Sequence, residues 1–387
     1  MDSSVSILTN FVTPWELQTQ KKNNSITHSP KNSIVQKQHT NVPKSFIWSL
    51  DDINQPKQKL DAPIIDLEGF IRGDEMATKD AAELLKDVCS NHGFFQVINH
   101  GLDPKLLKEA YDNIGHFFML PTTLKAKALK KPGQLWGLSV AHADRLSTNL
   151  PWKETLSFPH HAMNNDDSAI DYFTSVLGTE FEHIGAIYQN YCNEMHKLSL
   201  IILELLAISL GVDRSYYRDF FEDAKSIMRL NYYPSCDEPD LVLGTGPHCD
   251  PTSLTVLYQN EVEGLEVFVN NKWQAVEPRA DALVINIGDT FMAMTNGQYK
   301  SCLHRAVVNE KVARTTMAFF LCPKEDKVVK PPESLNKPRK YPDFTWSDFV
   351  LFTQKHYRAD ANTLESFTNW MWSRLSSDDS KKINLEV

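Results

Sequence analysis

The chain has 387 residues, of which 42% are hydrophobic and 10% aromatic, and its formal net charge is -9. This length and composition allow one extended domain or two closely packed domains with a large core. An acidic surface repels phosphate backbones and anionic lipid head groups, so the charge argues against nucleic acid and against a membrane surface as partners.

The six cysteines are spread along the chain without a C-x-x-C pair, and they are Cys89, Cys192, Cys236, Cys249, Cys302 and Cys322. Disulfide frameworks are typical of short secreted chains, and the first ten residues show no pattern of a secretory signal. We therefore expect reduced thiols in a cytoplasmic protein. As a separate expectation, the protein acts as a monomer. The most apolar stretch, residues 198–212, is too short to span a bilayer and contains Glu204, which favours a core helix.

The first part of the chain divides into a polar segment and a mainly helical region. Residues 1–42 contain too few hydrophobic positions to offset their ordering entropy, so we predict that they are disordered. Residues 43–220 are predicted to be mainly helical with a few strands. The helical spacing of apolar residues is found at 80–90, 106–118 and 181–210. The runs typical of short strands are 62–67 and 94–98.

From residue 221 to residue 325 the pattern changes to short β-branched and aromatic runs separated by turn residues. The runs that predict strands are 254–258, 265–269, 273–276, 283–287, 291–294, 305–308 and 315–321. Asn270-Asn271 and Asn296-Gly297 stand where hairpin turns are expected. We therefore predict an α+β fold with a jelly-roll core, a double-stranded β-helix, flanked by helices. Residues 326–387 are predicted to form a helical extension that packs across the barrel.

A candidate metal site is formed by His248 and Asp250, which lie two positions apart, and by the distant His304. Residues two apart on a strand point to the same face, so His248 and Asp250 can hold one ion together. Two imidazoles and one carboxylate suit Fe(II) and leave coordination positions open. An H-x-D pair alone is weak evidence for a metal site, because a chain with 13 histidines can contain one by chance. The alternative is that the two are surface polar residues at the end of a strand.

A second candidate feature is Arg314, which stands at the start of an apolar run. A guanidinium at the mouth of a strand can pair bidentately with a carboxylate, and the hydroxyl of Thr316 shares its face. This pair can hold one end of a keto-diacid whose other end chelates a metal. Taken alone, Arg314 is equally an exposed charge at a strand end. The combination with the His-Asp-His set is what favours a keto-acid-dependent iron site.

Residues 231–234, N-Y-Y-P, complete a pattern that resembles the plant 2-oxoglutarate/Fe(II) dioxygenases from about residue 43 to about residue 360. The resemblance implies that Fe(II) and 2-oxoglutarate are required, with ascorbate as a supporting reductant and O2 as the oxidant. It also implies that Tyr233 and Asn231 contact the 2-oxoglutarate carboxylate next to the iron. The family usually has serine where this chain has Thr316, and threonine keeps the hydroxyl.

Within that family, two longer motifs resemble the gibberellin 20-oxidases: residues 150–155, L-P-W-K-E-T, and residues 243–253, L-G-T-G-P-H-C-D-P-T-S. The resemblance implies stepwise oxidation of C-20 in a C20 gibberellin, a diterpenoid acid such as GA12 or GA53, towards C19 gibberellins. It also implies that the substrate is contacted by Trp152, Lys153, Glu154 and Arg145. Lys153 and Arg145 would pair with its carboxylates. Without the motif, Lys153 is as consistent with a solvated lysine and Trp152 with a core aromatic.

Three stretches depart from the pattern of this group: residues 134–140, residues 157–161 and Ser49. They concern substrate preference and leave the metal chemistry unchanged. The alternatives are another plant dioxygenase, such as a gibberellin 3-oxidase or a flavonoid oxygenase, a non-catalytic jelly-roll protein that binds a small molecule, and a zinc hydrolase. The intact ligand set argues against the non-catalytic protein.

Overall fold

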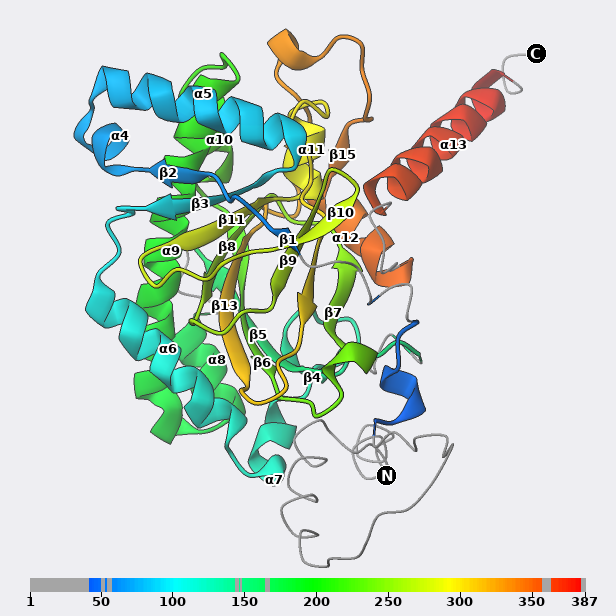
Figure 1. Cartoon of the computed structure of the whole chain (residues 1–387). Helices are drawn as coiled ribbons and strands as arrows, with labels where there is room; N and C mark the ends of the chain where they lie inside the picture. The colour runs from blue at the N-terminus through cyan, green and yellow to red at the C-terminus, as the bar shows by residue number, and fades with distance from the viewer. Residues whose placement is uncertain are drawn as a thin grey trace, which may run out of the picture.

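The computed structural model describes residues 42–49, 53, 58–142, 146, 148–163, 168–356 and 363–383, with side chains in the last range up to residue 374. The segment predicted to be disordered lies outside these ranges except for Val42. Two β-sheets form the centre of the molecule, and a layer of helices covers one side of them (Figure 1).

The larger sheet has eight strands. In spatial order they are β2 (Ile64–Asp66), β3 (Phe94–Ile98), β11 (Leu283–Ile287), β8 (Leu254–Gln259), β13 (Arg314–Leu321), β6 (Lys225–Tyr233), β5 (Glu154–His161) and β4 (Gly137–Val140). β13 lies in the middle and pairs antiparallel with both β6 and β8, so that Ala318 is opposite Arg229 on one side and Leu257 on the other. Nearly all of β13 and β11 is buried, which matches their continuous apolar runs.

The smaller sheet has five strands. In spatial order they are β1 (Gln58–Lys59), β10 (Lys272–Ala275), β9 (Leu265–Val269), β12 (His304–Val307) and β7 (Leu243–His248). Asn270 and Asn271 form the β9–β10 turn with φ angles of 52° and 59°, as a type I′ hairpin requires. From β6 to β13 the chain passes back and forth between the two sheets, which is the jelly-roll topology. The predicted fold class is therefore confirmed.

The helices surround this core. The α-helices are α4 (Glu68–Arg72), α5 (Glu75–Asn91), α6 (Pro104–Phe118), α7 (Thr122–Lys125), α8 (Ala169–Val176), α9 (Glu182–Ser209), α10 (Tyr216–Phe221), α11 (Asp289–Met294), α12 (Trp346–Lys355) and α13 (Thr363–Ile383). The 3-10 turns are Lys44–Phe46, Ala126–Ala128, Thr179–Phe181, Pro239–Leu241 and Glu333–Leu335. β14 (Val328–Val329) pairs with β15 (Phe344–Thr345), and α13 extends away from the sheets (Figure 1).

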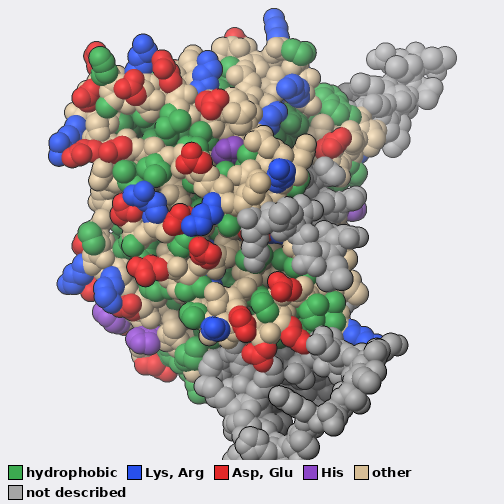
Figure 2. Space-filling view, in the orientation of Figure 1, with side chains coloured by type: hydrophobic (Ala, Val, Ile, Leu, Met, Phe, Trp, Pro, Cys, Tyr) green, Lys and Arg blue, Asp and Glu red, His purple; other side chains and the backbone are tan. Residues whose placement is uncertain are grey.

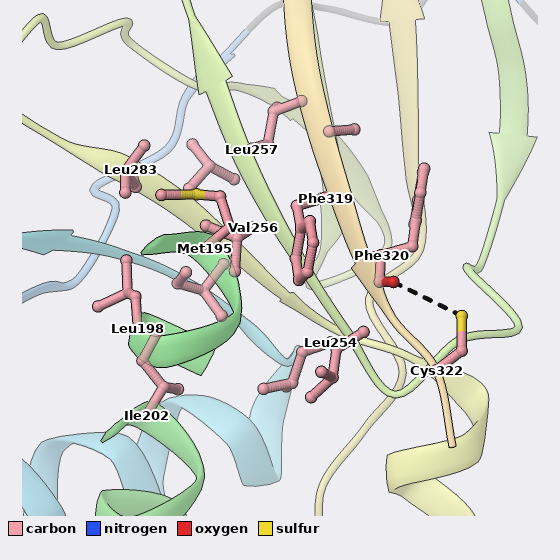
Figure 3. Close-up of a cluster of buried hydrophobic side chains, with 14 of the residues drawn as sticks. Met195, Leu198, Ile202, Leu254, Val256, Leu257, Leu283, Phe319, Phe320 and Cys322 are labelled. Atoms are coloured by element: carbon pink, nitrogen blue, oxygen red, sulfur yellow. Dashed lines mark hydrogen bonds between the residues drawn. The ribbon is translucent and has the colours of Figure 1, made fainter. Parts of the chain in front are cut away.

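The apolar face of α9 forms the main contact between the helical layer and the larger sheet. Figure 3 shows Met195, Leu198 and Ile202 of α9 facing Val256 of β8 and Phe319 of β13. The apolar stretch predicted to be a core helix is thus largely part of α9 and buried. In the part of the chain that the structure describes, no helix is long and apolar enough to cross a membrane.

Three local features differ from the sequence predictions. The run 291–294 was expected to be a strand but lies in helix α11, because its buried residues, among them Phe291 and Met294, share one helical face. Asn296 and Gly297, with φ angles of 51° and 74°, follow the end of this helix rather than forming a hairpin turn. Strand β5 was not predicted, although polar Thr155 alternates with apolar residues there.

A buried ion pair joins α7 to β5. Lys125 Nζ lies 2.7 Å from Glu154 Oε2, and the two side chains are only 8% and 2% exposed. Removing one partner leaves the other charge buried and uncompensated. The pair therefore fixes the start of β5 against α7.

We expect Lys125→Met to lower the free energy of unfolding by about 3–5 kcal/mol, because the Glu154 carboxylate then has no cation. The double variant Lys125→Met/Glu154→Leu should recover most of the loss. Urea denaturation followed by circular dichroism measures both. A single variant as stable as the wild type would show that the pair contributes no stability.

Candidate active site

Two strands of the smaller sheet bring three potential metal ligands together. β7 ends at His248, and β12 begins at His304, which is paired with His248 in the antiparallel register. Asp250 follows β7 in a loop, so it is not on the strand as the sequence suggested. His248 Nε2 lies 3.6 Å from Asp250 Oδ1, and His304 Nε2 lies 3.9 Å from Asp250 Oδ2. The ligand atoms of the three residues are all within 4.8 Å of one another.

The surroundings orient each of these side chains towards one point. His248 Nδ1 lies 2.9 Å from the Gly246 carbonyl, and His304 Nδ1 lies 3.0 Å from the Cys302 carbonyl. A carbonyl oxygen can only accept, so both Nδ1 atoms carry the hydrogen and both Nε2 lone pairs face the site. The hydroxyl of Thr255 donates to Asp250 Oδ2 at 2.5 Å.

The protonation states also suit a divalent cation. Burial, reinforced by the neighbouring His304, lowers the pKa of His248 to about 3, so this imidazole is neutral at physiological pH. Burial alone would raise the pKa of Asp250, but His304 and His248 hold that pKa below its usual value. Two histidines and one ionised carboxylate on one side of a point form the facial set that binds Fe(II) and leaves positions open for other ligands.

A narrow pocket next to the metal ligands contains Arg314, which is the first residue of β13, as predicted. Its side chain is buried, so it is not an exposed charge at a strand end. One terminal nitrogen of Arg314 donates to Gln259 Oε1 at 2.8 Å, and its guanidinium carbon lies 5.3 Å from the centre of the Tyr233 ring. Thr316 shares the face of Arg314, and its hydroxyl accepts from Asn231 Nδ2 at 3.0 Å. The pocket is thus lined by Arg314, Thr316, Tyr233 and Asn231, and Gln259 holds Arg314 from behind this lining.

Several polar atoms in and around this pocket have no hydrogen-bond partner among the described residues: Arg314 Nε, Asn231 Oδ1 and Gln259 Nε2. Buried polar atoms are rarely left unpaired, because each costs free energy. A carboxylate at Arg314 would satisfy the guanidinium, and an acid that reached from there to the metal ligands would fill the pocket. The residues therefore fit 2-oxoglutarate, a diacid that chelates iron at one end and binds an arginine at the other.

The antiparallel register of β6 and β13 places Tyr233 opposite Arg314 in the narrow pocket. The expected contact of Tyr233 with 2-oxoglutarate stays a prediction. Asn231 is opposite Thr316 in the same register. Strand register is a tertiary property, so a motif within β6 alone could not have shown these partners.

Of the four residues expected to contact substrate, the structure brings Lys153 to the site. Lys153 lines both the narrow pocket and a wider neighbouring cavity, and its Nζ donates to Thr245 Oγ1 at 2.9 Å. Its side chain is buried, which lowers the pKa of Lys153 to about 7. A lysine buried here is consistent with a ligand contact and not with a solvated surface position.

The structure places Trp152 and Glu154 outside the lining of both pockets. Trp152 packs edge-on against Phe46 with ring centres 5.1 Å apart, inside a small apolar cluster. Glu154 points to the opposite side of β5 from the cavity and pairs with Lys125. Arg145 lies outside the described residues.

The wider cavity has a volume of about 1120 Å³ and opens beside the metal ligands. Its walls include several residues that the sequence did not single out, namely Thr155, Ser157, Arg229, Phe320, Trp346 and Val350. The first two continue the alternation that begins at Lys153, so the period of two in this segment was the available signal. The stated volume includes open solvent at the mouth of the cavity.

Comparison with known proteins agrees with this geometry. Residues 224–323 match the 2OG-Fe(II) oxygenase superfamily, and residues 62–175 match the non-haem dioxygenase in morphine synthesis N-terminal family. The chain belongs to the 2OG-Fe(II) oxygenase superfamily. Fe(II) and 2-oxoglutarate are accordingly the cofactor and co-substrate of this oxygenase.

Several curated relatives are similar over most of the chain. Gibberellin 20 oxidase 2 of Oryza sativa subsp. japonica is 53% identical over 331 residues, which cover 85% of each chain. Gibberellin 20 oxidase 2 of Arabidopsis thaliana is 53% identical over 334 residues, which cover 85% of this chain and 87% of the relative. Gibberellin 20 oxidase 1-B of Triticum aestivum is 51% identical and covers 92% of the relative and 85% of this chain.

Solved structures share the fold of this oxygenase. JOX2, crystallised in complex with 2OG, Fe and JA, superimposes with a TM-score of 0.74 at 30% identity, over 87% of this chain and 98% of that chain. The dioxygenase for auxin oxidation in rice superimposes with a TM-score of 0.63 at 27% identity, over 76% of this chain and 95% of that chain.

We expect Asp250→Ala to weaken Fe(II) binding roughly 100-fold or more, because it removes the only carboxylate among the three ligands. Loss of a ligand should cost more than loss of a residue that only hydrogen-bonds to a ligand. Thr255→Val, which removes only the hydrogen bond to Asp250, is the matched control and should cost about 10-fold. Anaerobic titration calorimetry with Fe(II) measures both. Wild-type affinity in Asp250→Ala would refute the metal site.

We expect Arg314→Ala to raise the KM for 2-oxoglutarate roughly 10- to 100-fold, as the loss of a charged hydrogen bond predicts. The KM for the oxidised substrate should change much less. Arg279→Ala, which removes a surface arginine, is the control. An Arg314→Ala enzyme impaired only in affinity for the oxidised substrate would contradict this role.

Proposed function

We propose that this protein is a gibberellin 20-oxidase that uses Fe(II) and 2-oxoglutarate to oxidise C-20 of C20 gibberellins stepwise towards C19 gibberellins. The observation that carries the proposal is the sequence identity of 50% or more to gibberellin 20 oxidases from three plants, over 85–88% of this chain. The intact His-Asp-His set favours an oxidising enzyme over a non-catalytic binding protein.

The residues of the narrow pocket bind and orient the co-substrate. His248, Asp250 and His304 hold the iron, and Arg314 with Thr316 holds the far carboxylate of 2-oxoglutarate. Tyr233 lies opposite Arg314 and is proposed to contact 2-oxoglutarate. The bound iron, with 2-oxoglutarate and O2, supplies the oxidising chemistry. The protein's contribution is to fix the positions of the reactants and to exclude bulk water from the buried pocket.

The wider cavity receives the gibberellin, a rigid apolar body with carboxylate groups. Lys153 lies where the cavity meets the narrow pocket and binds a substrate carboxylate. Trp152 and Glu154 hold in place the segment that carries Lys153. Trp152 anchors this segment in the apolar cluster, and Glu154 holds it against α7 through Lys125. Arg145, which precedes the L-P-W-K-E-T motif in the sequence, is proposed as a further cation for the substrate.

Incubation of the purified protein with Fe(II), 2-oxoglutarate, ascorbate and GA12 or GA53 should give succinate and gibberellins oxidised at C-20, detected by mass spectrometry. Lys153→Met should raise the KM for the gibberellin roughly 10-fold, the size of one charged hydrogen bond, and leave the KM for 2-oxoglutarate less affected. Flavonoids serve as the comparison substrates. Oxidation of a flavonoid, or hydroxylation of a gibberellin elsewhere than C-20, would refute the proposed function.

A further inference from the structure

The wider cavity carries an excess of positive charge. Its basic lining residues, besides the metal ligand His248, are Lys130, His142, Lys153 and Arg229. Its acidic lining residue is Asp250, whose carboxylate belongs to the metal site. The whole chain has a formal net charge of -9, and the face in Figure 2 shows acidic and basic side chains interspersed. A cation-lined cavity in an acidic protein favours an anionic ligand.

Among these cations, Arg229 and Lys153 line both the narrow pocket and the wider cavity. Arg229 lies on β6 two residues before Asn231 and four before Tyr233, so all three side chains share one face of the strand. Arg229 lines the narrow pocket together with these residues, and it also lines the wider cavity. A ligand group bound to Arg229 would therefore lie at the junction of the two spaces, beside the metal ligands.

Two neighbours hold the guanidinium of Arg229 in a fixed plane. Arg229 Nε donates to the hydroxyl of Ser157, its partner across the β5–β6 pair, at 3.0 Å. The guanidinium carbon lies 5.0 Å from the centre of the Phe320 ring. Figure 3 shows that Phe320 lies on the other side of β13 from Phe319, which faces α9. Nε and one ring face thus fix the plane of the guanidinium, whose planar shape matches a carboxylate.

A second cation stands close to this guanidinium. Burial, together with the positive charge of Arg229, lowers the pKa of Lys153 to about 7, and the Asp250 carboxylate opposes this shift. Within the described ranges, Lys153 forms no ion pair with a carboxylate; its Nζ contacts the hydroxyl of Thr245. The Asp250 carboxylate interacts electrostatically with both cations but belongs to the metal site. A further anion beside Lys153 and Arg229 would offset the cost of burying two cations.

We propose that Arg229 is a specificity-determining residue that binds a carboxylate of the substrate, with Lys153 as the second cation. The inference rests on the proposed function and adds to it a residue outside the L-P-W-K-E-T motif. The carboxylate fixes the rigid ring system at the junction of the cavity and the narrow pocket. Arg229 thereby selects acids and sets which carbon of the substrate faces the metal ligands.

The test compares ligand charge with residue charge in equilibrium binding. The ligands are GA12 and its fully methyl-esterified form, and the variants are Arg229→Gln, Arg229→Lys and the surface control Arg279→Gln. Binding is measured by titration calorimetry without oxygen on protein loaded with Fe(II) and 2-oxoglutarate. The affinities for Fe(II) and for 2-oxoglutarate are measured separately on each variant.

The wild type and Arg279→Gln should bind the free acid roughly 10- to 100-fold more tightly than the ester, as expected for hydrogen bonds to a charged group. Arg229→Gln should lose most of this difference, and Arg229→Lys, which keeps the charge but not the planar guanidinium, should retain part of it. The affinities for Fe(II) and 2-oxoglutarate should stay within about 3-fold of the wild type, since neither ligand is bound by Arg229 in this proposal.

Two results would overturn the role of Arg229 while the proposed function stands. One is an unchanged preference for the acid over the ester in Arg229→Gln. The other is a loss of Fe(II) or 2-oxoglutarate affinity as large as the loss for GA12, which would assign Arg229 to the metal site through Asp250. A wild-type protein that neither binds nor oxidises GA12 would instead refute the proposed function itself.

Discussion

The antiparallel pairing of β7 with β12 is the constraint on which the active site depends. It places His304, the first residue of β12, opposite His248, the last residue of β7, although the two are far apart in the chain. The register shifts between His304 and Ala306 and again between Ala306 and Val307, so the pairing is irregular next to the metal ligands. Because β12 also pairs with β9, His304 has little freedom to move away from Asp250. The metal geometry is therefore a property of the sheet before any ion binds.

β13 combines stability and function through the alternation of its side chains. Phe319 faces α9 and belongs to the main core, whereas Arg314, Thr316 and Phe320 face the pocket and the cavity. The pairing with β6 sets Tyr233 and Asn231 against the functional face. A shift of one residue would exchange the two faces, burying polar groups in the core and exposing the aromatic ring to the cavity. The register of this strand is thus fixed by both the core and the site.

The sequence was sufficient to predict an element or a site residue where the chemistry of the residue and the local pattern agree. The apolar runs gave β9 and β11 with their observed bounds, and Arg314 was predicted at the start of its strand. The sequence failed where tertiary packing decides between local alternatives. A four-residue apolar run could not distinguish helix α11 from a strand, and the N-Y-Y-P motif could not show that Tyr233 is paired opposite Arg314. Gln259, which holds Arg314, has no sequence signal of its own.

The L-P-W-K-E-T motif shows why residue type alone does not assign a role. Lys153 and Glu154 are adjacent, so the pleat sends them to opposite sides of the segment. Lys153 enters the cavity near Arg229, while Glu154 is neutralised on the far side by Lys125. If Glu154 pointed into the cavity, its carboxylate would pair with Lys153 and cancel the positive charge that favours an acidic ligand. The buried Lys125–Glu154 pair therefore serves the site by keeping the one acidic group of the motif away from it.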